Sequence, residues 1–204
     1  MIYRGPVLFL SNNDNSKSLY SWINEQVNAF FWDKRVDIDM ISQISPYIVV
    51  SYNYNYIIPK EVIDYMNGNI INLHISFLPW NRGASPNLWS FLDGTPKGVT
   101  IHRIDEGLDK GRILFQKEMF FDEKEETLRT SYDKLNEEIV RLFKEHWVDI
   151  YNRTCDEIEP RGKGSYHSNS DLEKLQQMIS FSWDDRVFDV IELYNVFSQN
   201  ENRF

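Results

Sequence analysis

The stretch NLHISFLPWNRG, Asn72 to Gly83, places two polar side chains in an otherwise apolar run that ends at a proline. Strand residues two positions apart point to the same face, so Asn72 and His74 share one face. Leu73 and Ile75 take the other face. A parallel strand that is buried on both faces is normally apolar throughout. The polar pair therefore indicates a site, because ligands of open parallel sheets bind beyond the carboxyl ends of the strands.

Strand and helix signals alternate on both sides of this stretch. Strands are predicted at 7–10, 29–32, 47–51, 69–74, 98–104 and 113–121, and helices at 18–30, 37–44, 59–66, 86–92, 126–151, 171–177 and 184–194. Such alternation is typical of an α/β fold with a mostly parallel, twisted sheet and helices on both faces. Because the segment 154–170 is polar and rich in glycine and proline, it is interpreted as a loop. We expect a catalytic domain at 1–153 and a short helical and loop extension at 154–204 packed on it.

Composition limits the classes of function. The chain has 204 residues, of which 42% are hydrophobic, and this suits one sizeable core. A formal net charge of -9 disfavours nucleic acid as a partner, since its binders present basic surfaces. One cysteine excludes an internal disulfide, and four dispersed histidines form no metal-binding pattern. No apolar run is long enough for a signal peptide or a membrane span, so we expect a soluble cytoplasmic protein.

A second polar segment, DEGLDKG from Asp105 to Gly111, follows the predicted strand 98–104. A loop after a neighbouring strand can bring a carboxylate to His74. An Asn, a His and an Asp together can catalyse acyl transfer to an amine. The neutral histidine accepts the proton of the amine, the amide and the protonated histidine stabilise the oxyanion, and the carboxylate orients the imidazole. An Asn-x-His pair also occurs where both side chains merely bond the local backbone.

A wider pattern surrounds these residues. It consists of Asn72-x-His74-x-Ser76-x-Leu78-Pro79, Arg82-Gly83, Pro86, Trp89, the run GVTIH from Gly98 to His102, and Asp105-Glu106-x-x-Asp109-x-Gly111. In order and spacing it resembles the formyltetrahydrofolate-dependent formyltransferase family, with the strongest agreement over about 51–114. It looks closest to the small nucleotide-sugar N-formyltransferases and to the formylation domains of peptide synthetases. The resemblance implies a Rossmann-like formyltransferase fold and 10-formyltetrahydrofolate as formyl donor; the unclustered histidines separately predict no metal.

The resemblance also assigns roles to residues. It implies Asn72, His74 and Asp109 as the catalytic trio. The implied cofactor-binding residues are Tyr54, Tyr56, Ile58, Leu78, Asp105, Glu106 and Gly107. Aromatic walls suit a flat pterin, although each tyrosine also fits ordinary strand packing.

Candidate residues for the formyl acceptor come from their positions after the catalytic strand and in the polar tail: Trp80, Asn81, Arg82, Tyr166 and His167. Arg82 suits a phosphate but equally a surface ion pair. Tyr166 and His167 also fit a docking contact for the tail. His102 and His146 are expected to be structural.

The choice of acceptor depends on departures from the related enzymes. Glycinamide ribonucleotide formyltransferases have a glycine-containing turn after the first strand, where this chain reads SNNDNS. Methionyl-tRNA formyltransferases carry a further nucleic-acid-binding domain and a basic surface. We therefore predict an N-formyltransferase of the EC 2.1.2 class that acts on the amine of a nucleotide-linked amino sugar in surface-glycan precursor biosynthesis. Related sugar enzymes are often dimers, so a homodimer is a further expectation.

Three alternatives stay open. In a formyltetrahydrofolate hydrolase, water would replace the amine on the same catalytic trio. A formyltransferase for another small amine would act on glycinamide ribonucleotide or an aminoacyl group. A noncatalytic folate-binding module would not need all three catalytic residues. A nicotinamide enzyme is disfavoured, because no G-x-G-x-x-G follows the first strand.

Overall fold

The structure is a computed structural model that describes residues 2–201 and divides into two compact units. Unit 1 comprises Met1–His74, Ile101–Phe115 and Val140–Pro160, and unit 2 comprises Ile75–Thr100, Gln116–Ile139 and Arg161–Phe204. The predicted domain boundary at residue 154 stays a prediction, and 202–204 of the predicted extension lie outside the described residues.

One six-stranded sheet runs in the order β2-β1-β3-β4-β6-β7. Its strands are β1 Val7–Leu10, β2 Ala29–Trp32, β3 Ile48–Tyr52, β4 Ile70–His74, β6 Lys97–Arg103 and β7 Ile113–Met119. The neighbours β2-β1-β3-β4 all pair in parallel, and β1 and β3 are buried along their whole length. The predicted α/β class with a mostly parallel sheet is confirmed.

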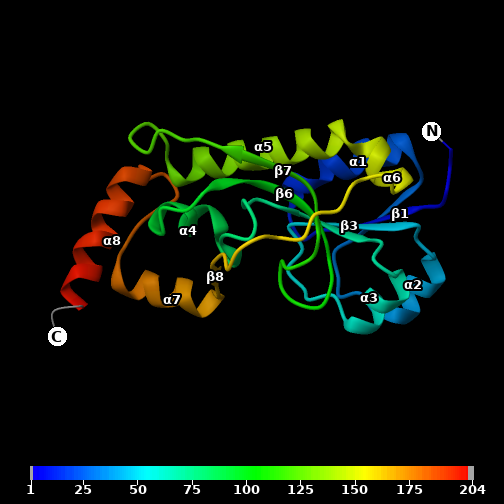
Figure 1. The fold of residues 1–204 in the computed structure, drawn as a ribbon, viewed down its shortest axis with the longest axis horizontal. Helices are drawn as coiled ribbons and strands as arrows, with labels where there is room; N and C mark the ends of the chain where they lie inside the picture. Colours follow the sequence, from blue (N-terminus) through cyan, green and yellow to red (C-terminus); the bar gives the residue numbers. More distant parts are fainter. Residues whose placement is uncertain (1, 202–204) are drawn as a thin grey trace. The chain divides into compact units, whose positions relative to one another are not determined.

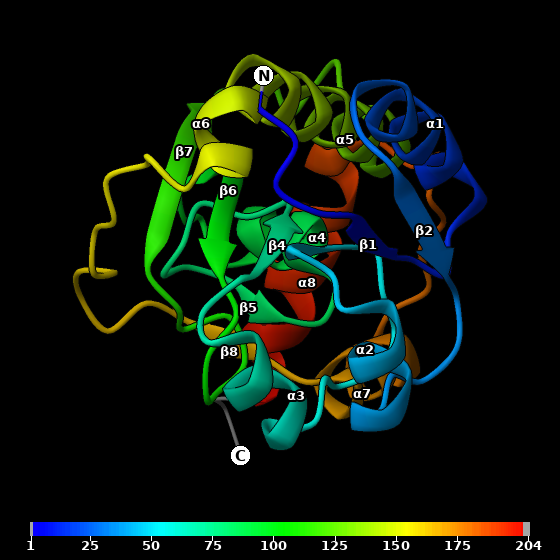
Figure 2. The same cartoon turned by 90° about the vertical axis from the view of Figure 1, so that its right-hand side faces the viewer.

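Helices cover both faces of the sheet in unit 1. The helices α1 Lys17–Gln26 and α6 Trp147–Asn152 lie on one face, and α2 Ile38–Ile44 and α3 Lys60–Met66 lie on the other (Figures 1 and 2). A 3-10 turn at Asp14–Ser16 precedes α1. The start of α2 is fixed by Asp37, whose side chain accepts a hydrogen bond from the Met40 amide at 2.8 Å.

Two predicted helices of this layer have different bounds. The helix predicted at 18–30 ends at Gln26, because Val27 is extended (φ -150) and leads into β2. The helix predicted at 126–151 is two helices, α5 Leu128–Glu145 and α6, because His146 leaves the helical conformation (φ -103, ψ 11).

Unit 2 has its own apolar core. Helices α4 Pro86–Leu92, α7 Asn169–Met178 and α8 Val187–Glu201 share it with the first turn of α5. Its buried members are Leu88, Trp89, Phe91, Leu128, Leu175, Ile179, Val187 and Val190. Ser168 and Asp171 form a capping box that starts α7.

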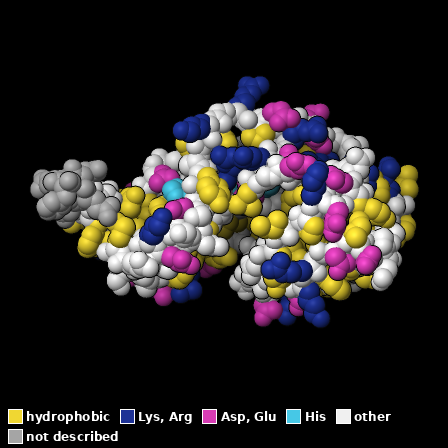
Figure 3. Space-filling view, turned by 90° about the horizontal axis from the view of Figure 1, so that it is seen from below, with side chains coloured by type: hydrophobic (Ala, Val, Ile, Leu, Met, Phe, Trp, Pro, Cys, Tyr) yellow, Lys and Arg dark blue, Asp and Glu magenta, His cyan; other side chains and the backbone are white. Residues whose placement is uncertain are grey.

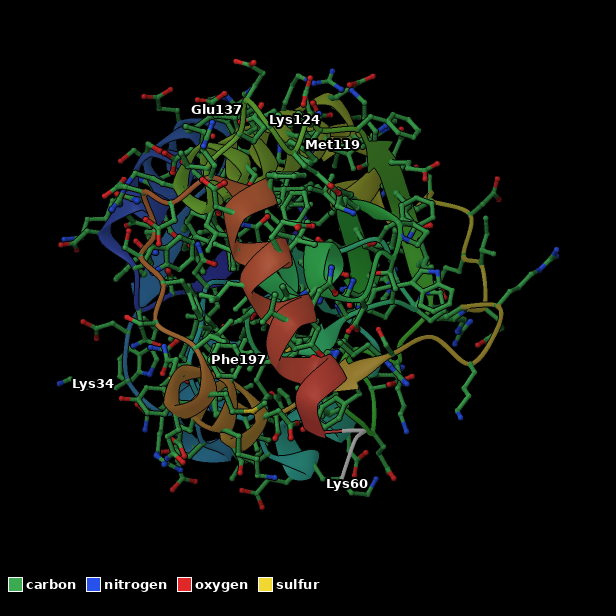
Figure 4. All side chains as sticks on the ribbon, turned by 90° about the vertical axis from the view of Figure 1, so that its left-hand side faces the viewer. Lys34, Lys60, Met119, Lys124, Glu137 and Phe197 are labelled. Carbon is green, nitrogen blue, oxygen red and sulfur yellow. The ribbon has the colours of Figure 1, made fainter. Side chains whose placement is uncertain are left out.

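The end of α8 leaves apolar side chains in solvent. Val196 and Phe197 are 59% and 40% exposed. Figure 4 labels Phe197 on α8, beside α7, and Figure 3 shows hydrophobic side chains on the surface at this end of the unit. Within the described residues, no helix combines the length and the apolar character that a membrane crossing requires.

A second, two-stranded sheet was not predicted. The parallel strands β5 Arg82–Gly83 and β8 Tyr166–His167 pair Arg82 with Tyr166 and Gly83 with His167. The polar segment 154–170, interpreted from the sequence as a loop, therefore contains a short strand. This sheet belongs to unit 2.

Candidate active site

Strand β4 carries the polar pair as the sequence predicted. Asn72 lies opposite Ser51 of β3, and His74 is the last residue of the strand. His74 is 8% exposed, and Asn72 is half-buried. Leu73, between them, is buried on the opposite face. The strand therefore fixes both polar groups on one face of the sheet.

The loop between β6 and β7 brings Asp109 to this pair. Asp109 is left-handed (φ 51), a conformation that aspartate adopts more readily than most residues. Gly111 then returns the chain against β6, where an added Cβ would lie 1.9 Å from the carbonyl oxygen of Arg103. Lys60 of α3 forms ion pairs with both Glu106 and Asp64, which joins the loop to the helix. The tight turn at Asp109 to Gly111 thus returns the chain to β6 next to the polar pair.

The three predicted catalytic side chains meet in unit 1. Nδ2 of Asn72 lies 3.5 Å from Oδ1 of Asp109, and Nε2 of His74 lies 3.8 Å from Oδ2 of the same carboxylate. The side chains of His74 and Asp109 are about nine-tenths buried. Among the described residues, the buried Nε2 of His74 has no hydrogen-bond partner.

A fourth side chain, His102, belongs to the same cluster. Its Nε2 lies 3.4 Å from Nδ2 of Asn72 and 3.6 Å from Oδ1 of Asp109, and its Nδ1 lies 2.8 Å from the carbonyl oxygen of Arg103. These contacts give His102 the structural role that was expected for it. They also connect it to the candidate catalytic residues Asn72 and Asp109. The sequence signal for this was its place two residues beyond Thr100 in the GVTIH run, on the strand next to β4.

Burial determines the charge of His102. It lowers the pKa of His102 to about 4, with a smaller lowering from His74, while the Asp109 carboxylate acts in the opposite direction. The ring is therefore neutral at pH 7. In the neutral tautomer that fits its contacts, Nδ1–H donates to the Arg103 carbonyl and Nε2 accepts from the Asn72 amide.

The predicted pterin residues near β3 also lie in unit 1. The hydroxyl of Tyr54 donates to the Lys34 carbonyl at 2.6 Å and accepts from the Val36 amide at 3.2 Å. Burial raises the pKa of Tyr54 to about 12. Ile58 is buried in the core cluster against which Tyr54 packs. Tyr54 and Ile58 thus anchor the segment 54–58 to the core of unit 1.

The residues between them are more accessible. The ring of Tyr56 is half-buried and meets that of Tyr54 edge to face, with centroids 5.4 Å apart. The guanidinium of Arg35 lies 5.1 Å from the centre of the Tyr56 ring. Ile57, which is not among the predicted site residues, is 88% exposed. The sequence signal for Ile57 was its position as an aliphatic residue between Tyr56, which is half-buried, and Ile58, which is buried.

The predicted cofactor-binding residues Asp105 to Gly107 lie between His102 and Asp109 in the sequence. Burial raises the pKa of Asp105, and the negative charge of Glu159 adds to the effect. Glu106 pairs with Lys60, and Gly107 takes a positive φ of 119. The loop therefore offers backbone groups in a conformation held by an ion pair.

The predicted acceptor residues, and Leu78, belong to unit 2. Leu78 is 2% exposed, and its amide donates to the Thr100 hydroxyl at 3.2 Å. Trp80 and Arg82 are half-buried. Asn81 is fully buried, and its Nδ2 donates to the Thr95 hydroxyl at 2.7 Å. The structure thus keeps the Asn81 amide inside the protein.

The two tail residues have different environments. Tyr166 is 52% exposed. His167 stacks on Trp89 with ring centroids 3.9 Å apart, and its Nε2 lies 2.7 Å from Oδ2 of Asp93. Nowhere in the described part of the chain do three or more His, Cys, Asp or Glu side chains form a group that could hold a metal ion.

Comparison with known proteins gives matches of three kinds. A family described as "Formyl transferase" matches residues 32–146. The crystal structure of the formyltransferase PseJ from Anoxybacillus kamchatkensis, in complex with UDP-4,6-dideoxy-4-formamido-L-AltNAc and tetrahydrofolate, is 38% identical. It aligns over 93% of this chain and 100% of that chain, with a TM-score of 0.85.

Two curated proteins illustrate the range of sequence relatives. The dTDP-4-amino-4,6-dideoxyglucose formyltransferase of Mycobacterium bovis is 31% identical over 64% of this chain and 55% of its own length. The methionyl-tRNA formyltransferase of Ehrlichia ruminantium (strain Gardel) is 40% identical over 48% of this chain and 32% of its own length. The chain thus spans about a third of the length of the curated methionyl-tRNA enzyme that it matches.

Proposed function

Because this chain belongs to the formyl transferase family and shares its fold, we propose that it moves the formyl group of 10-formyltetrahydrofolate to the amine of a nucleotide-linked amino sugar. The observation that carries this proposal is the cluster of Asn72, His74, His102 and Asp109, in which the Asp109 carboxylate lies within 4 Å of the Asn72 amide and of both imidazoles.

His74 is assigned the role of the general base that takes the proton of the attacking amine. The amine nitrogen forms a bond to the formyl carbon, and the bond from that carbon to N10 of the folate breaks. His74 takes the proton that the amine loses, and a proton is returned to N10 as it leaves. The Asp109 carboxylate, 3.8 Å from Nε2 of His74, stabilises the imidazolium that forms in between.

Asn72 is assigned to the formyl oxygen. Negative charge builds up on this oxygen during attack, and a fixed N–H donor in a buried site stabilises it. One N–H of Asn72 is held by the neutral His102. The other makes only a contact of 3.5 Å to Asp109, at the limit of hydrogen bonding, so this N–H is the one assigned to the formyl oxygen.

The residues near β3 fit the folate donor. A flat bicyclic ring needs an apolar or aromatic surface that is open to ligand. The half-buried ring of Tyr56 and the exposed Ile57 supply such a surface, while Tyr54 and Ile58 support it from the core. The backbone of Asp105 to Gly107 is assigned to the polar edge of the pterin.

Acceptor binding is assigned to unit 2, with Trp80, Arg82 and Tyr166 as its contact residues. The nucleotide-linked sugar is supported by the two sugar formyltransferases among the relatives, one of which matches over its whole length. The net charge of -9 disfavours tRNA as acceptor, because phosphate backbones are bound by basic surfaces. A cytoplasmic homodimer that serves surface-glycan precursor synthesis completes the proposal.

The test is a transfer assay with 10-formyltetrahydrofolate and a panel of UDP- and dTDP-linked 4-amino sugars, with methionyl-tRNA and glycinamide ribonucleotide as further acceptors. Formation of tetrahydrofolate and the mass of each acceptor are followed. We expect a formylated sugar with the wild type and none with His74→Ala. Folate turnover without a formylated sugar, or formylation of only the other acceptors, would overturn the assignment of the acceptor.

A further inference from the structure

One serine outside the predicted site, Ser165, joins two distant parts of unit 2. Its amide donates to the Pro79 carbonyl at 3.2 Å, and its carbonyl accepts from the Arg82 amide at 3.1 Å. Its hydroxyl accepts a hydrogen bond from the backbone N–H of Asn81 at 2.8 Å and donates one to Oδ1 of the Asn81 side chain at 3.1 Å. We call the segment Pro79–Ala84 the acceptor loop. Every polar group of Ser165 therefore bonds this loop.

Asn81 receives these bonds in a demanding conformation. It is fully buried and left-handed (φ 52), which few residues other than glycine and asparagine adopt without strain. In its side-chain amide, Nδ2 donates to the Thr95 hydroxyl and Oδ1 accepts from the Ser165 hydroxyl. An amide of this kind, left without the Ser165 hydroxyl, would hold an unpaired buried oxygen, which is unfavourable. Ser165 thus stabilises the turn at Asn81.

The same tail segment orients Arg82. Nε of Arg82 lies 3.4 Å from the Ser165 carbonyl oxygen, and Nη2 lies 3.3 Å from the Lys163 carbonyl oxygen. Farther along, the Ala84 amide donates to the His167 carbonyl at 2.8 Å. The tail therefore fixes both the backbone of the acceptor loop and the direction of its one guanidinium group.

We propose that Ser165 is a positioning residue for acceptor binding. Through Asn81 it holds the acceptor loop in the shape that presents Trp80 and Arg82 to the nucleotide-linked amine, and Arg82 is directed at the anionic diphosphate of that acceptor. This inference rests on the function proposed above. Because both hydrogen bonds of the hydroxyl go to Asn81, we expect its removal to affect the acceptor more than the donor.

The experiment compares three variants of the full chain. Ser165→Ala removes the hydroxyl, Ser165→Thr keeps it, and Ser170→Ala removes an exposed hydroxyl from α7 as the matched control. With Ser165→Ala we expect the KM for the acceptor to rise about tenfold, with kcat and the KM for 10-formyltetrahydrofolate within about twofold of wild type. Ser165→Thr restores the acceptor KM, and Ser170→Ala leaves all three constants unchanged.

Amide hydrogen exchange gives a readout that needs no substrate. The amide of Asn81 exchanges faster in Ser165→Ala than in the wild type and in Ser165→Thr. An unchanged acceptor KM in an active Ser165→Ala variant, or equal changes in the KM values of acceptor and folate, would overturn the proposal. If the wild type formylates no nucleotide-linked sugar, the proposed function fails, and the exchange rates still decide whether Ser165 fixes the loop.

Discussion

Nδ2 of Asn72 on β4 lies 3.4 Å from Nε2 of His102 on the neighbouring strand β6. The second ring nitrogen of His102 is bound to the Arg103 carbonyl at 2.8 Å. A neutral imidazole held in this way acts as a hydrogen-bond acceptor that sets the rotation of the Asn72 amide. The orientation of the Asn72 side chain, which is proposed to be catalytic, thus depends on the protonation state of a buried neighbour.

Removing the imidazole of His102 is predicted to slow catalysis without unfolding the protein. In His102→Ala the Asn72 amide loses its fixed orientation, and kcat falls by roughly ten- to a hundredfold, the range expected for a misplaced catalytic group. Steady-state transfer kinetics measure the change, and circular dichroism checks that the fold is kept. A His102→Ala variant that is folded and has wild-type kcat would contradict the role assigned to His102.

His102 is also predicted to make stability depend on pH. Its pKa is about 4 when folded and 6.5 when unfolded, so between these values the unfolded state binds the additional proton. The free energy of unfolding therefore falls as the pH is lowered from 6.5 to 4, by up to about 3 kcal/mol. Urea unfolding of wild type and His102→Gln across this range measures the difference. Equal pH slopes for the two proteins would rule the prediction out.

The carboxylate of Asp109 is predicted to act on the chemical step. Asp109→Asn removes the charge that stabilises protonated His74, so kcat falls by about 100- to 10,000-fold while the KM values change little. Asp156→Asn, which removes an exposed carboxylate from unit 1, is the control and keeps wild-type kinetics. A comparable loss in both variants would show that overall charge, rather than this contact, matters.

The exposed Ile57 is predicted to contribute to folate binding. In Ile57→Ser the apolar surface beside Tyr56 is lost, and the KM for 10-formyltetrahydrofolate rises by about three- to tenfold with an unchanged acceptor KM. The melting temperature stays the same, because the side chain is 88% exposed. Ile2→Ser changes a similarly exposed isoleucine (75%) as the control. A donor KM that is the same in both variants would refute this assignment.

Local sequence signals predicted most of this structure. The alternation of polar and apolar residues at Asn72 and His74 indicated the strand and its functional face, and Asp37 marked the start of α2. The contacts of His102 depend on which strand lies next to β4, and single-residue patterns do not specify this. The pairing of β5 with β8 joins residues 84 positions apart, so tertiary packing, and not local propensity, creates these strands.

Close backbone approach at Gly164 is predicted to limit substitution. A Cβ there would lie 1.9 Å from the Pro79 carbonyl oxygen, so Gly164→Ala displaces the tail from the acceptor loop and lowers the free energy of unfolding by about 1–3 kcal/mol. Gly162→Ala is the matched control, since Gly162 also has a positive φ but has no atom within 4 Å of an added Cβ. Equal destabilisation of both variants would indicate backbone strain as the cause instead of the steric clash.

The bonds between Ser165 and the acceptor loop also constrain the order of folding. The bonds from Asn81 and Arg82 to Ser165 span more than 80 positions, so a ribosome must add all of the intervening residues before the loop after β4 can reach its final shape. Closing so long a segment is entropically unfavourable and comes after local helices have formed. A nascent chain therefore acquires the strand that carries Asn72 and His74 well before its acceptor loop is complete. If the loop binds the acceptor as proposed, the nascent chain becomes competent for it only after Ser165 has been synthesised.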